Sequence, residues 1–267
     1  MNNAMRFFSN KLFFVGLAML VFSCSDHVDE TDETHGSVEQ TFDFEEETIR
    51  AFVMDKLQLK PEDIGSFEMK RAHLNADSIQ DGFVFLNLAP KAMRDMETSS
   101  NPARFQDAGY IGDYNYIFVW DGATQKMGTA FKLVGNGLVP IEVSLIQLLD
   151  PGYKTLTARY RVQNSIFETY FQNVGGSLVP VFSYLVVDQM GSKAMTMYYH
   201  AVEENPSQLE KDIVIYGGVC PTYNADEAAR DKNTYAIGPI QSDGQEIYRF
   251  FYDPKSGKYA TNAPLPE

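Results

Sequence analysis

The sequence predicts a mostly β protein, either an antiparallel β-sandwich or a partly open barrel, with an N-terminal amphipathic helix. Between residues 66 and 252, apolar and polar side chains alternate in short runs, as they do along strands that face a core on one side. Turn signals rich in Gly, Asn, Asp and Pro separate these runs at about the spacing of sandwiches and barrels. Helical periodicity is clearest in a segment that precedes the first of these runs.

The expected helix lies just before Pro61, which ends the helical pattern. Its apolar side chains recur at helical spacing and form one stripe: Ile49, Phe52, Val53 and Leu57. Acidic side chains precede the stripe, where they interact favourably with the N-terminal end of the helix dipole. We therefore expect a helix that packs on the β domain through this stripe.

Eleven segments are expected to be strands: 66–74, 82–88, 114–120, 127–134, 138–148, 154–162, 166–174, 178–187, 193–202, 213–220 and 246–252. Three shorter helices are expected at 91–97, 206–211 and 225–231. Asn224 is suited to cap the last of these helices. Residues 257–267, which contain two prolines, are expected to be weakly structured.

The side-chain patterns of two expected strands predict how far each strand is exposed to solvent. In the strand at 154–162, Thr157, Arg159 and Arg161 alternate with apolar side chains, which predicts that one face meets solvent. The strand at 178–187 is apolar at nearly every position, which predicts burial on both faces.

A short internal repeat relates residues 134–140 to residues 174–180. Both copies combine a glycine-rich turn with a following Leu-Val-Pro sequence. We expect two similar hairpins, over 127–148 and 166–187, because glycine permits the positive φ angles of tight turns.

Composition limits the function. The chain has 267 residues with 36 acidic and 22 basic side chains, and its net charge is −14. Nucleic acid is therefore not expected as a partner, because no basic surplus is available to neutralise phosphates. A chain of this length can bury a sizeable core without a metal or a cross-link.

The N-terminus has the features of a secretory signal. Arg6 and Lys11 precede an apolar run of 11 residues, Leu12–Phe22. This run is too short to span a bilayer, which takes about 20 apolar residues. Residues 1–23 are therefore expected to be a signal peptide that is removed.

Cys24 changes this prediction from a secreted to a tethered protein. The stretch Leu20–Cys24 resembles the lipobox of bacterial lipoproteins, although Val21 and Phe22 stand where that family prefers leucine and a small residue. The resemblance implies that Cys24 carries a lipid. The protein would then be held on the membrane by its acyl chains, each buried CH₂ contributing about 0.8 kcal/mol.

An acidic stretch follows Cys24. Residues 25–50 carry ten acidic side chains and one basic one. Such a self-repelling run predicts an extended tether over residues 24–42, followed by a single β-rich domain over 43–267. The stretch is similar to that of Bacteroidetes-type lipoproteins exported to the cell surface, which implies an outer-membrane protein that faces the exterior. The periplasmic face is the alternative.

Motifs for metal, cofactor or nucleophilic chemistry are not found in the sequence, so no cofactor and no metal or catalytic residue is assigned. Cys220 follows an apolar run and is expected to be a buried structural thiol. The oxygen-bearing loop 75–82 lacks the Gly and the final Glu of a calcium-binding EF-hand loop. Glu142 lies between two apolar residues, where burial would raise its pKa and suit a general acid.

Aromatic side chains give the most specific candidate for a binding site. Tyr114, Tyr116, Phe118 and Trp120 share one face of their strand, and Tyr248, Phe250 and Tyr252 share another. Such rings either stack on sugars or fill a core. We take Tyr114, Tyr116 and Trp120 as candidate ligand contacts, with a partly exposed Trp120 indole near a sheet rim.

Three functions are compatible with these observations. The favoured one is a cell-surface lipoprotein that binds a glycan or protein ligand without catalysis. The second is an adhesin or structural subunit, since the lipoprotein signal, acidic spacer and β-rich body also resemble fimbrillin-type precursors. The third is a hydrolase that uses a carboxylate pair not marked by any motif.

Overall fold

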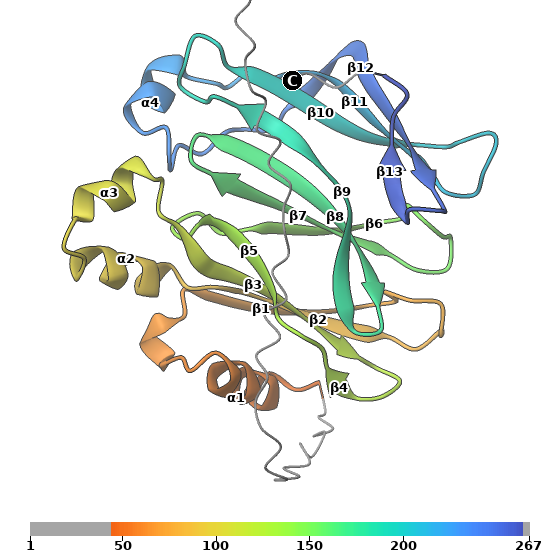
Figure 1. Cartoon of the computed structure of the whole chain (residues 1–267), viewed down its shortest axis with the longest axis horizontal. Helices are drawn as coiled ribbons and strands as arrows, with labels where there is room; N and C mark the ends of the chain where they lie inside the picture. The colour runs from red at the N-terminus through yellow and green to blue at the C-terminus, as the bar shows by residue number, and fades with distance from the viewer. Residues whose placement is uncertain (1–43, 264–267) are drawn as a thin grey trace, which may run out of the picture. The chain divides into compact units, whose positions relative to one another are not determined.

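Residues 44–263, which the computed structural model describes, form two antiparallel β-sheets packed face to face (Figure 1). The predicted mostly β sandwich with an N-terminal helix is confirmed. Each of the eleven segments expected to be strands overlaps at least one strand. The predicted signal, Cys24 and the whole of the predicted tether, residues 24–42, lie outside the described residues.

The first sheet has five strands within the described residues, in the order β1-β2-β3-β4, and β5 also pairs with β3. The strands are β1 Ser66–Ala72, β2 Asp81–Asn87, β3 Ile111–Asp121, β4 Lys126–Met127 and β5 Phe131–Asn136. The helical elements of this half are α1 Glu46–Lys56, the 3₁₀ turn Pro61–Asp63, α2 Ala89–Glu97 and α3 Pro102–Asp107. The sequence did not predict α3.

The second sheet has eight strands in this part of the chain, and each pairs with its neighbours in sequence from β6 to β13. The strands are β6 Glu142–Ile146, β7 Thr155–Val162, β8 Ser165–Val174, β9 Ser177–Asp188, β10 Thr196–Glu203, β11 Asp212–Val219, β12 Gln241–Asp253 and β13 Lys258–Ala260. Helix α4, Ala225–Arg230, lies between β11 and β12, and the side chain of Asn224 caps it as expected.

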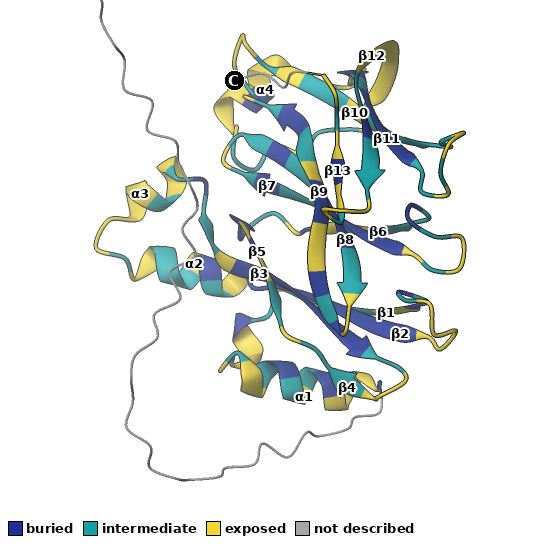
Figure 2. Cartoon of the chain, turned by 45° about the vertical axis from the view of Figure 1, so that its right-hand side comes forward, coloured by how far each residue is buried: buried dark blue, intermediate teal, exposed yellow. Residues whose placement is uncertain are grey.

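Alternation along β2 and β3 produces two apolar layers. Phe83, Phe85 and Ile117 point to the second sheet and pack on Leu156 and Phe171 of β7 and β8. This layer is the core between the sheets, and the buried central strands that enclose it are dark in Figure 2. The intervening side chains of β2 and β3 point to the opposite face, which α1 and α2 cover.

The aromatic ladder of β3 belongs to this helix-covered layer. Tyr114, Tyr116 and Trp120 are 7, 7 and 4% exposed, and the Trp120 ring lies 5.1 Å from that of Phe44. The expectation of a partly exposed indole at a rim is therefore wrong. The ladder is buried because β3 has a paired strand on each side and α1 packs on its outer face.

The internal repeat has two different outcomes. Residues 174–180 form part of a true hairpin between β8 and β9, with Gly175 and Gly176 at positive φ in its turn. Residues 134–140 do not form a hairpin, because β5 pairs with β3 whereas β6 pairs with β7. Residues 137–141, called the crossover below, instead carry the chain from the first sheet to the second.

Several local expectations are wrong. Residues 206–211 form turns rather than a helix, and residues 258–260 form β13 rather than a loose tail. Cys220 is partly exposed, because β11 ends at Val219, and its Sγ lies 3.5 Å from Thr222 Oγ1. Strand β9 is not buried on both faces, since Val179 is 41% exposed.

None of the helices among residues 44–263 combines the length and the apolar character that crossing a bilayer would require.

Candidate functional site

The polar face of β7 is the least expected part of the structure. The alternation of Thr157, Arg159 and Arg161 predicted a solvent-facing surface, yet Thr157 is 2% and Arg161 3% exposed. Residues 231–240, called the covering segment below, connect α4 to β12 and lie next to Arg159 and Arg161 at one end of this face. Tyr235 and Ile237 of that segment pack with Ile166 of β8 and with other buried side chains of the second sheet.

A cavity of about 550 Å³ lies between the end of β7, the crossover and the covering segment. Its volume falls in the range of pockets that hold small ligands. The lining is mostly apolar, with Arg159 and Arg161 as its cationic side chains among the described residues: Leu138, Val139, Pro140, Glu142, Arg159, Tyr160, Arg161, Ile166, Val186, Thr234, Tyr235, Ala236, Ile237, Gly238 and Pro239.

Arg161 is buried with few partners. Its Nη2 donates to the thioether Sδ of Met190 at 2.8 Å, a weak acceptor for a guanidinium. Its Nε is buried and has no hydrogen-bond partner among residues 44–263, and no carboxylate of these residues lies within ion-pair distance of it. Desolvation lowers the pKa of Arg161 and the charge of Asp231 opposes this, but the group stays protonated because an arginine side chain does not lose its proton in proteins.

Arg159, by contrast, is neutralised by acids. Its Nη2 lies 3.1 Å from Glu168 Oε2, and its Nη1 lies 3.8 Å from Glu142. Glu168 also faces His200 Nδ1 at 3.5 Å, and Tyr170 Oη lies 3.4 Å from the same ring nitrogen. Arg159 therefore joins the cavity to a buried polar cluster, which we define as Arg159, Glu168, Tyr170 and His200.

His200 is closed off within this cluster. Its side chain is 2% exposed, and its Nε2 lies 2.8 Å from the carbonyl oxygen of Leu185. Desolvation lowers the pKa of His200, although Glu168 opposes the shift, and burial raises the pKa of Tyr170 well above its usual value. Both groups are thus neutral near pH 7, and the cluster is a structural network rather than an exposed acid–base pair.

Buried asparagines hold the crossover in place. Asn87 Nδ2 donates to the carbonyl oxygen of Gly137 at 2.9 Å, and Leu138 N donates to Asn136 Oδ1 at 2.8 Å. Asn115 joins them, since its Oδ1 accepts from Asn87 and its Nδ2 donates to the carbonyl of Asn136. The first wall of the cavity is thereby fixed to the first sheet.

The covering segment is tied to the same residues. Asn136 Nδ2 donates to the carbonyl oxygen of Asn233 at 2.8 Å, so one side chain contacts both walls of the cavity. Asn233 Nδ2 in turn donates to the carbonyl oxygen of Gln106 in α3 at 2.6 Å. Tyr235 Oη accepts from Asn224 N at 3.0 Å, which anchors the segment to the start of α4. The walls are therefore preformed.

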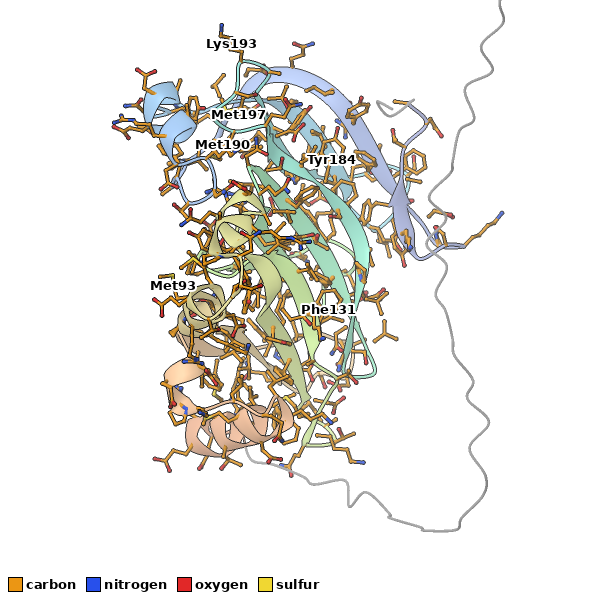
Figure 3. All side chains as sticks on the ribbon, turned by 60° about the vertical axis from the view of Figure 1, so that its left-hand side comes forward. Met93, Phe131, Tyr184, Met190, Lys193 and Met197 are labelled. Carbon is orange, nitrogen blue, oxygen red and sulfur yellow. The ribbon has the colours of Figure 1, made fainter. Side chains whose placement is uncertain are left out.

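A second aromatic group lies on the face of the second sheet that points away from the first. The Tyr184 ring lies 5.5 Å from Tyr198 and 5.9 Å from Tyr248, and desolvation raises the pKa of Tyr184 to about 12. Figure 3 places Tyr184 toward β12, whereas Met190 and Met197 lie together near α4. These tyrosines are half-buried and pack on Phe250, so they extend a core.

Other candidates from the sequence are placed apart from one another. The Glu142 side chain is 76% exposed, so burial does not adapt it to general-acid catalysis. In the loop 75–82, Asp81 accepts from Leu74 N and Gly122 N, and Asn75 and Asp77 accept from backbone N–H groups two residues ahead. No group of three or more His, Cys, Asp or Glu side chains in the described chain is arranged to hold a metal ion.

Comparison with known proteins found no match among family models, curated proteins or solved structures.

Sequence reasoning missed Arg161 because alternation shows which face of a strand is polar but not what covers that face. The covering segment contains Tyr235, Ile237 and Ile240, whose short and irregular pattern does not mark it as part of a core. One signal was present, since arginines at 159 and 161 share a face without an acidic residue between 151 and 167 to pair with them.

Proposed function

We propose that this protein is a lipid-anchored, surface-exposed binding protein whose β domain takes a small amphipathic molecule into the cavity beside β7. The observation that carries the proposal is the preformed 550 Å³ cavity, whose mostly apolar lining includes two arginines, Arg159 and Arg161. Most ligand pockets have this character, apolar with a few placed polar groups.

Binding without catalysis fits the lining better than hydrolysis does. Glu142 is the one carboxylate among the described residues that line the cavity, whereas hydrolysis by a carboxylate pair needs two. His200 is enclosed in the buried polar cluster and does not line the cavity.

The nature of the lining also bears on the ligand. The glycan proposal rested on stacking by Tyr114, Tyr116 and Trp120, and these rings lie in the core. Leu138, Pro140 and Ile237 instead present aliphatic surface. An apolar molecule with a polar end matches this lining better than a sugar does, because a sugar needs hydrogen-bond partners for each hydroxyl it buries.

The anchored location is supported by the sequence. Cys24 follows a short apolar run, and the acidic stretch after it would hold the domain away from a membrane. An adhesin or structural subunit remains a second proposal with this same support.

A neutral fluorescent probe tests whether the cavity binds ligands. N-phenyl-1-naphthylamine should gain fluorescence with full-length Cys24→Ser protein. The substitution Val139→Trp places a large ring on a half-buried lining residue and should weaken probe binding at least tenfold. Val134→Trp is the matched control, since Val134 is 53% exposed on neighbouring β5 and does not line the cavity. Equal binding by both variants would contradict the proposal.

A further inference from the structure

We propose that the ligand of this cavity is an organic acid with one carboxylate and an apolar body, and that the Arg161 guanidinium binds the carboxylate. The inference rests on the proposed function, because it names the ligand class of the same cavity. Neither the predicted lipid anchor nor the β fold explains why Arg161 is buried beside this cavity.

The first argument is the distribution of charge. Glu168 and Glu142 both face Arg159, and Glu168 also contacts His200. Asp231 acts on Arg161 only as a charge beyond ion-pair distance, and its carboxylate accepts a hydrogen bond from the hydroxyl of Thr234. Arg161 is therefore the cation of the lining that lacks an ion-pair partner within the described chain.

The second argument is hydrogen bonding. Buried charges in proteins are normally paired, because an isolated one is costly to remove from water. Arg161 has instead a thioether at Nη2 and no partner at Nε among the described residues. A guanidinium offers a planar fork of donors that matches the two oxygens of a carboxylate. A carboxylate ligand would supply both the missing charge and the missing acceptor.

The third argument concerns the number of charges on the ligand. A phosphate monoester carries about two negative charges near pH 7 and needs several donors. The described lining contains one arginine without an ion-pair partner and no lysine, and Glu142 would repel a second negative charge near Arg159. The aliphatic side chains of Ile166, Val186 and Ile237 are available to the rest of the molecule. A monocarboxylate matches this arrangement.

Decanoate and decan-1-ol test the inference, because they differ mainly in the charged group. In displacement of N-phenyl-1-naphthylamine from full-length Cys24→Ser protein, decanoate should bind at least tenfold more tightly than decanol. This comparison needs no substitution in the cavity. Isothermal titration calorimetry with decanoate alone gives the same affinity if the probe binds poorly.

Arg161→Met should abolish the preference for decanoate, so that decanoate and decanol bind with similar affinities. Arg161→Lys should keep part of the preference, since it retains the charge without the fork. Arg104→Met, on the exposed surface of α3, is the control and should leave the preference unchanged. Apo Arg161→Met should melt at or above the temperature of the parent protein, which a purely structural arginine would not allow.

The outcomes separate the two proposals. Equal affinities for decanoate and decanol, or an unchanged preference in Arg161→Met, would overturn the carboxylate inference, while probe binding blocked by Val139→Trp would leave the cavity proposal standing. Failure of the probe, decanoate and decanol to bind at millimolar concentration would overturn both.

Discussion

Arg161 illustrates what a single residue in a strand can and cannot reveal. Its position opposite the apolar side chains of β7 was predictable, because side chains alternate along a strand. Its burial was not, because it depends on residues 231–240, which approach β7 only in the folded chain. The site was therefore hidden at the level of sequence, although the strand that carries it was predicted nearly to the residue.

His200 should make stability depend on pH. Burial lowers its folded pKa below the unfolded value of about 6.5. As pH falls through 6.5, the unfolded chain takes up a proton that the folded chain resists, so the free energy of unfolding decreases. Glu168, Arg159, Tyr170 and the Leu185 carbonyl surround the ring. His200→Gln should flatten the decrease between pH 7 and pH 5, measured by urea unfolding.

His73→Gln is the matched control for this measurement, because His73 is not part of the buried polar cluster. Parallel profiles for the parent protein and His200→Gln would show that His200 does not contribute to the pH dependence.

Trp120 should behave as a core residue. Trp120→Ala removes a ring that packs on Phe44, so we expect a loss of about 3–5 kcal/mol in the free energy of unfolding. The parent protein should show blue-shifted emission with little quenching by iodide. Val174→Ala, at a site 54% exposed, should change stability by less than about 0.5 kcal/mol. Strong iodide quenching in the native state would contradict this burial.

At the scale of elements, the crossover shows how similar sequences take different roles. The two Leu-Val-Pro stretches at 138–140 and 178–180 have the same local preferences. The stretch 178–180 follows a turn between paired strands. The stretch 138–140 instead leaves the first sheet, because hydrogen bonds from Asn87 and Asn136 hold the chain at Gly137 and Leu138. The difference lies in long-range hydrogen bonds, which a repeat cannot show.

Asn136 links the crossover to the covering segment, so it should affect both stability and binding. Asn136→Ala removes its hydrogen bonds to Leu138 N and to the Asn233 carbonyl, and each buried group left unpaired costs about 1–3 kcal/mol. We expect lower stability and weaker probe binding, measured by urea unfolding and fluorescence titration. Asn101→Ala, which removes the cap of α3, should reduce stability without changing probe affinity. Loss of affinity in both variants would argue against this specific role.

At the scale of the whole molecule, the fold was the predictable part. Alternation and turn signals located the strands because both are local properties. The covered faces and the cavity depend on how distant segments meet, so neither followed from local pattern. The aromatic ladder shows the same limit, since a core and an exposed platform have the same spacing in sequence.

Lipidation of Cys24 is a prediction that rests on the sequence alone. Cys24 is the thiol that a lipobox would present, so Cys24→Ser should move the protein from the membrane fraction to the soluble fraction. Fractionation followed by immunoblotting measures this. Cys220→Ser is the matched control and should leave the protein in the membrane fraction. Membrane retention of Cys24→Ser would contradict the lipoprotein assignment.

The order of strands in the second sheet has a consequence for folding kinetics. Because β6 to β13 pair in chain order, most of this sheet forms by closing short loops, which favours rapid folding. The cavity instead brings together Leu138 and Thr234, which are 96 residues apart in the sequence. We infer that its walls meet after the rate-limiting step. A bound ligand should then slow unfolding in stopped-flow experiments while leaving the refolding rate nearly unchanged.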